Sequence, residues 1–263
     1  MLHYAFMVHA LLAAGAVSVL CGLVGWFLLL RAEAFAGHAL SHVGFTGATG
    51  AVLLGLPPLA GLISATLAAG LAMGGLGARI GRRDVAIGMV LSLALGFGLF
   101  FLHFYTSYAA QATALLFGNV LAVDRATVLA LTGLCLVSLA GLALIGRPVL
   151  FAAIHPEIAE ARGISPRAIG MAFLAICAIA IAGAAEIVGV LLVFTLLIGP
   201  AAAAQSLSRR VTVGLVLAPV LALGQAWAGL TAGFYSGWPI SFWIAVFSFL
   251  TYVLATMLRP TEP

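Results

Sequence analysis

The stretch AIGMAFLAICAIAIAGAAEIVGVLLVFTLLIGPAAAAQ, residues 168–205, decides the fold. It runs for 38 residues with a single charged side chain, Glu186, at its midpoint. A membrane-spanning helix needs about 20 apolar residues, so the stretch is long enough for two. It therefore predicts a helix that crosses a membrane, a turn near Glu186 and a second helix that crosses back.

Glu186 itself has two interpretations. A carboxylate between two apolar segments of equal length is typical of a tight external turn, where the acid is exposed to water. Ionisable residues in membrane segments also mark ion pathways, so Glu186 is a candidate metal contact that lines an entrance and attracts cations.

The composition of the whole chain places it in the same class. Of the 263 residues, 64% are hydrophobic and 7% are charged, whereas about a quarter of a typical soluble domain is charged. No polar stretch is long enough for a separate soluble domain. We therefore expect one all-α membrane domain over residues 1–263, a polytopic bundle of about 8–10 transmembrane helices.

The apolar segments predict where these helices lie. The segment 105–123 is only half apolar and is interpreted as a re-entrant or surface helix. The predicted spans are 5–30, 38–55, 58–78, 85–103, 126–146, 168–186, 188–206, 211–232 and 240–258.

The arginines predict the orientation, since the chain has no lysine. With nine spans, ten of the eleven arginines fall on one side and only Arg125 on the other. Positive charge marks the cytoplasmic side, so the N-terminus is expected outside and the C-terminus in the cytoplasm. The net charge of +4 reflects this topology and predicts no nucleic-acid partner.

Two histidines stand out in GHALSHVGFTG, residues 37–47. His38 and His42 are four apart, so they share one helix face and both can reach one ion. Neutral imidazole is a good metal ligand and avoids the cost of a fixed charge in hydrocarbon. The alternative is that the two rings only hydrogen-bond to nearby hydroxyl groups and neighbouring helices.

The longest cytoplasmic connection, residues 147–167, predicts a short helix outside the membrane. His155 is a candidate N-cap, Pro156 suits a first turn, Glu157 favours the helix start and Gly163 a C-terminal stop. Such a helix is either a linker or a docking element that inserts into a groove on a cytoplasmic partner.

Four segments together resemble the metal-ion (zinc, manganese or iron) ABC importer permease family. In the order in which that family carries them, they are GHALSHVGFTG (37–47), ALLFGNVLAV (114–123), HPEIAEARGI (155–164) and EIVGVLLVFTLLIGPAAAA (186–204). The resemblance implies the helical permease fold of the vitamin B12 importer. It also implies that the segment near 150–167 couples to an ATPase through His155, Pro156, Glu157, Ala159 and Gly163.

The resemblance further implies the assembly. Two copies of the permease (a homodimer) in a bacterial inner membrane would act with cytoplasmic ABC ATPase subunits and an extracytoplasmic metal-binding protein. The chain has no GxxxxGK[ST] motif, so ATP hydrolysis is expected in the ATPase, and the chain itself is expected to be no enzyme. The divalent metal ion is then a transported substrate, with no permanently bound cofactor.

The chain departs from the family at one position, since His38 stands where the family usually has Asp. Two imidazoles favour zinc, with manganese or iron next. One alternative is a permease for a metal chelate or other small solute, with His38 and His42 structural. A remote alternative is a membrane metalloenzyme, but the chain has six histidines and no HExxH motif.

Overall fold

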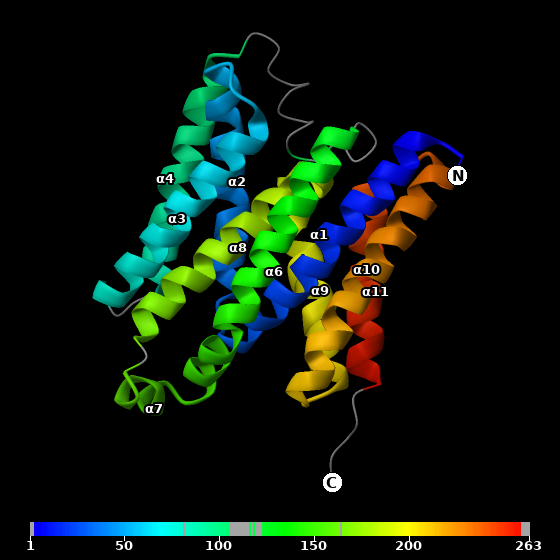
Figure 1. Ribbon diagram of the computed structural model, residues 1–263. Helices are drawn as coiled ribbons and strands as arrows, with labels where there is room; N and C mark the ends of the chain where they lie inside the picture. Colours follow the sequence, from blue (N-terminus) through cyan, green and yellow to red (C-terminus); the bar gives the residue numbers. More distant parts are fainter. Residues whose placement is uncertain are drawn as a thin grey trace.

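The computed structural model describes residues 3–80, 83–105, 116, 118, 123–163 and 165–258. All regular secondary structure in these ranges is helical, as the sequence predicts (Figure 1). The helices are α1 (Ala5–Leu30), α2 (Ala34–Leu53), α3 (Pro58–Ile80), α4 (Arg83–His103), α6 (Arg125–Ile154), α7 (Pro156–Ala161), α8 (Pro166–Val188), α9 (Val190–Leu207), α10 (Val211–Ser236) and α11 (Ile240–Met257).

Each of the nine predicted spans coincides with one of these helices. By length and composition, seven helices in the described ranges can cross a membrane, namely α1, α3, α4, α6, α8, α10 and α11. The helix α2 falls outside this group, and α9 contributes a shorter apolar segment, Leu192–Leu207. The segment 105–123, predicted to be re-entrant or superficial, lies almost wholly outside the described residues.

The predicted boundaries differ from the observed ones by a few residues at several helices, and the largest difference is at the end of α6. The span predicted to end at residue 146 continues to Ile154, with Pro148 inside the helix. A proline removes only one backbone hydrogen bond. The residues that follow are held by packing, because Val149 is fully buried and Ala152 is buried. The connection predicted at 147–167 is therefore shorter than expected, and its first part is the last two turns of α6.

Small residues allow the helices to cross closely. A Cβ atom at Gly25 of α1 would lie 1.9 Å from the carbonyl oxygen of Leu197 in α9. At the crossing of α2 and α3, a Cβ atom at Gly47 would lie 2.1 Å from the carbonyl oxygen of Gly61. Such contacts are typical of tightly packed membrane helices. In Figure 1, α2, α3 and α4 form one side of the bundle and α1, α9, α10 and α11 the other.

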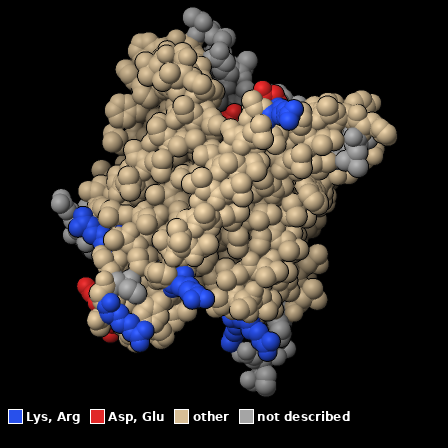
Figure 2. Space-filling view, in the orientation of Figure 1, with Lys and Arg blue, Asp and Glu red and all other residues tan. Residues whose placement is uncertain are grey.

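The predicted turn between the sixth and seventh spans is confirmed and is a single residue long. Gly189 joins α8 to α9 with φ 84° and ψ 153°, a conformation that only glycine adopts readily. Figure 1 shows α8 leading away from α7 and α9 returning toward the same end. Described arginine side chains gather at that end in Figure 2, and one lies at the opposite end.

Candidate functional site

His38 and His42 lie side by side on α2. Their ring centroids are 4.7 Å apart and the rings are nearly perpendicular, at 79°. Both side chains are half-buried. The helical spacing predicted this arrangement, and the short distance leaves both imidazoles able to face one ion.

The nearby hydroxyl groups donate to backbone carbonyls instead of to the imidazoles. Ser41 Oγ donates to Gly37 O (3.0 Å), Thr49 Oγ1 donates to Phe45 O (3.0 Å) and Thr46 Oγ1 donates to Ala94 O of α4 (2.6 Å). These bonds stabilise α2 and its contact with α4. The alternative in which the hydroxyl groups explain the histidines is therefore weakened.

An aromatic ring from a distant part of the chain also contacts His38. The ring of Phe194 in α9 lies edge-on to His38, with centroids 5.1 Å apart at 77°. Phe35, on the same face of α2, is 42% exposed. The histidines thus lie on a partly open face of the single chain, beside α9.

The chain offers few ligands at this place. Within the described part of the chain, no group of three or more His, Cys, Asp or Glu side chains is placed to hold an ion. Two ligands are too few for a closed tetrahedral site. They suit a transient site, from which an ion is released, or half of a site completed by a second chain.

Glu186 does not join the histidines in such a group. It lies in the last turn of α8, three residues before Gly189, and is partly exposed. The first turn of α8 carries Arg167. That turn lies next to α7, at the end of the bundle where the described arginines gather (Figures 1 and 2). Glu186 is therefore near the opposite end of α8 from the arginines, which agrees with the interpretation as an acid at an external turn.

We expect Glu186→Cys to react with a membrane-impermeant thiol reagent from outside the cell. The three native cysteines are buried and are replaced by alanine in this experiment. Leu258→Cys is the matched control, because Leu258 at the end of α11 is 70% exposed and should react only from the cytoplasm. Labelling of Glu186→Cys from the cytoplasmic side alone would contradict this placement.

The predicted short helix is confirmed as α7, which is six residues long instead of the predicted seven. His155 occupies the N-cap position, as predicted, although its side chain makes no capping hydrogen bond. Pro156 occupies the first turn and Glu157 is the acid of that turn, as predicted. Gly163 has φ 76°, as a glycine stop requires.

Packing orients α7. Ala159 is fully buried, whereas Ile158 is 48% exposed and Ile154 at the end of α6 is 49% exposed. The guanidinium carbon of Arg162 lies 5.3 Å from the centre of the Phe151 ring in α6. One side of α7 is therefore fixed to the bundle, and an apolar side with Glu157 nearby faces outward.

A buried ion pair that was not predicted from the sequence lies at the start of α2. Arg31 and Glu33 form a salt bridge of 2.8 Å, and their side chains are only 6% and 4% exposed. Two opposite charges two positions apart, in a chain with 7% charged residues, are the signal that could have found it.

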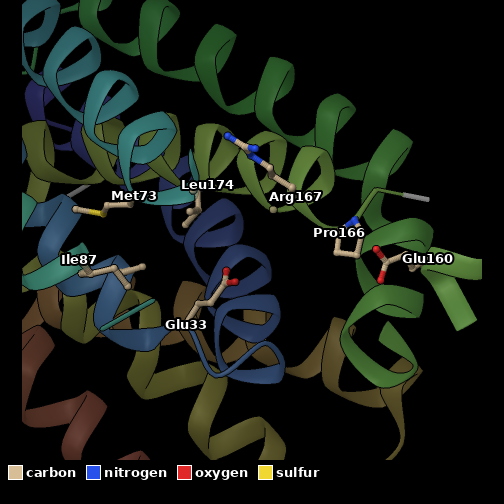
Figure 3. Close-up of a pocket in the computed structure, with 10 residues that line it drawn as sticks. Glu33, Met73, Ile87, Glu160, Pro166, Arg167 and Leu174 are labelled. Atoms are coloured by element: carbon tan, nitrogen blue, oxygen red, sulfur yellow. The ribbon is translucent and has the colours of Figure 1, made fainter. Parts of the chain in front are cut away.

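A cavity of about 340 Å³ lies next to this pair (Figure 3). Glu33 lines it together with residues of α3, α4, α7 and the start of α8. The cavity lies at the arginine-rich end, between α2, which carries the two histidines, and the short helix α7.

Comparison with known proteins gives consistent results. The model of the ABC 3 transport family matches residues 3–259. The manganese transport system membrane protein MntC of Halalkalibacterium halodurans is 32% identical over 88% of this chain and 79% of that protein. A probable iron transport system membrane protein of Haemophilus influenzae is 30% identical over 79% of this chain and 77% of that protein.

Solved structures show the same fold. A chain of PsaBC from Streptococcus pneumoniae in complex with Fab aligns with a TM-score of 0.86 at 24% identity, covering 98% of this chain and 93% of that one. A putative metal-chelate type ABC transporter in an inward-facing conformation aligns with a TM-score of 0.72 at 15% identity, covering 95% and 84%.

Proposed function

The chain belongs to the ABC 3 transport family, and from this membership we propose that it is the permease of a bacterial importer for divalent metal ions, with zinc preferred. It is a multi-pass membrane protein and the permease subunit of an ABC transporter, not itself an enzyme. Membership implies a cytoplasmic ATPase and an extracytoplasmic binding protein as partners. We propose that two copies of the permease form the pathway.

The observation that carries the choice of cargo is the pair of imidazoles 4.7 Å apart on α2. The relatives are named for manganese and iron transport, which supports a divalent metal as the class of substrate. A site made of imidazole alone favours zinc over these harder ions. A two-fold axis beside α2 would bring four imidazoles together, enough to hold an ion between two chains.

The proposed topology assigns each candidate element to one side of the membrane. The arginine-rich end with α7 is assigned to the cytoplasm, because cytoplasmic loops carry excess positive charge. The exposed apolar side of α7, with Ile158 and the nearby Ile154, is assigned to docking of the ATPase. Glu186, near the opposite end, is assigned to the external entrance, where a carboxylate attracts cations.

The experiment that tests this proposal is uptake into liposomes that contain the permease and its ATPase, with the binding protein outside. We expect ATP-dependent accumulation of zinc, and of manganese or iron at lower efficiency. Accumulation of a metal chelate but of no free ion would assign the permease to chelates instead. A failure to accumulate either would overturn the proposal.

The preference for zinc has a separate test at His38. We expect His38→Asp to keep uptake and to shift the preference from zinc toward manganese, because a carboxylate suits the harder ion. The measurement is the ratio of uptake rates when the two metals compete. His38→Asn is the control, because asparagine is similar in size to aspartate and lacks its charge. An unchanged ratio in His38→Asp would contradict a direct contact with the ion.

A further inference from the structure

The turn between α1 and α2 is held in one conformation by its own ion pair. Arg31 donates twice to Glu33, from Nη2 to Oε1 (2.8 Å) and from Nε to Oε2 (3.1 Å). Ala32 between them has φ 54°, the one positive φ outside glycine in the described part of the chain. A strained backbone conformation of this kind persists only where the surrounding structure holds it in place. Here the two parallel hydrogen bonds between Arg31 and Glu33 hold it.

This turn is attached on both sides. The guanidinium carbon of Arg31 lies 5.3 Å from the centre of the Phe173 ring in α8, and Phe173 is fully buried. On the other side, Glu33 O accepts hydrogen bonds from Ala36 N (3.0 Å) and Gly37 N (3.3 Å), the first turn of α2. His38 is the next residue. The turn therefore links α8, which follows α7, to the helix that carries the histidines.

The cavity of about 340 Å³ lies behind this turn. Figure 3 shows Glu33 on one side of it and Glu160 of α7, with Pro166 at the start of α8, on another. Ala36 also lines the cavity, and its place two residues before His38 puts it on the opposite side of α2 from the histidines. Space behind α2 allows its first turn to shift when α7 and α8 move.

We propose that Arg31 and Glu33 are positioning residues that transmit the movement of α7 to α2, and so set the position of His38 and His42. The inference rests on the proposed function, in which α7 docks the ATPase and the histidines contact the ion. The physical reason is that separating a buried ion pair leaves an uncompensated charge. The pair therefore moves together, and carries α2 with it.

The test measures how fast cysteines react with a thiol reagent in the assembled transporter, with and without ATP. Phe35→Cys reports on α2, because Phe35 is 42% exposed and lies two residues after Glu33. Glu157→Cys reports on α7. Val213→Cys, at the start of α10 and 39% exposed, is the matched control away from the turn. The native cysteines are replaced by alanine.

We expect ATP to change the reaction rate of Phe35→Cys and of Glu157→Cys severalfold, and that of Val213→Cys little. Adding Glu33→Gln should abolish the change at Phe35→Cys and leave the change at Glu157→Cys. Exchanging the two charges, by combining Arg31→Glu with Glu33→Arg, should restore the effect of ATP on the reaction rate of Phe35→Cys. A merely stabilising ion pair would lower the yield of the complex in Glu33→Gln and leave both rate changes intact, which would overturn the inference.

Two further outcomes are decisive. If Glu33→Gln gives no complex, the double variant Arg31→Gln with Glu33→Gln replaces it, because removing both partners leaves no unpaired charge in the bundle. A change of wild-type size at Phe35→Cys in this double variant would overturn the inference. Because no metal enters these measurements, a transporter that shows the expected pattern but carries no divalent ion would refute the proposed cargo and not the role of the turn.

Discussion

Replacing either His38 or His42 with alanine is expected to reduce metal uptake at least about tenfold, because loss of even an outer-shell partner commonly lowers metal affinity about 10–100-fold. The two rings lie 4.7 Å apart on a partly open face of α2, so each variant removes a proposed ligand without opening the core. Alanine is also well tolerated in a helix of small residues. The measurement is the initial rate of ATP-dependent zinc uptake into liposomes.

The matched control for this prediction is Ser41→Ala. Ser41 lies between the two histidines, and its hydroxyl group donates to Gly37 O of the same helix. We expect this variant to fold and to transport at nearly the wild-type rate. If the histidine variants also transport at the wild-type rate while folding normally, the pair is structural and the ion takes another route.

Combining Glu157→Arg with Gly163→Val is expected to uncouple ATP hydrolysis from uptake. The first change reverses an exposed charge in the first turn of α7. The second places a β-branched residue at φ 76°, which costs of order 1–3 kcal/mol and shifts the end of α7. A penalty of about 1.4 kcal/mol corresponds to a tenfold change in an equilibrium constant. We therefore expect the number of ions transported per ATP to fall about tenfold. The measurement is the number of ions transported per ATP hydrolysed.

Gly237→Val provides the control for strain alone. Gly237 has φ 70° and, like Gly163, leaves open space within 4 Å of the point where a Cβ atom would lie. It caps α10, far along the chain from α7. We expect this variant to lose some stability and to remain coupled. If the α7 double variant binds the ATPase normally and remains coupled, the proposed docking role of α7 is contradicted.

Much of the fold could be predicted because long apolar segments mark where most of the helices lie. The helix predicted at 5–30 is observed at Ala5–Leu30, and the turn beside Glu186 falls at Gly189. The error at the end of α6 came from Arg147 and Pro148, which look like a stop in the sequence. The helix continues past them because Val149 is packed in the core. Tertiary packing of this kind cannot be recognised from local composition.

The candidate site was predictable only where it is local. The pair His38 and His42 follows from helical spacing. Phe194, which contacts His38 from α9, lies 156 residues away, and no spacing rule connects them. The pair Arg31 and Glu33 depends on Ala32 at positive φ, a conformation that alanine rarely adopts, so its geometry could not be expected from the sequence.

The one-residue joint at Gly189 has a consequence for how this chain can change in length. If an inserted residue joined the first turn of α9, the rest of that helix would rotate by about 100° and move by about 1.5 Å along its axis. Such a rotation would carry Phe194 away from the ring of His38 and Gly25 away from Leu197, where the backbones touch. The connection at 54–57, by contrast, lies in four exposed residues that can absorb an insertion. Insertions and deletions should therefore be excluded from the joint and tolerated at that connection, which makes Gly189 a fixed reference point for the register of the second half of the bundle.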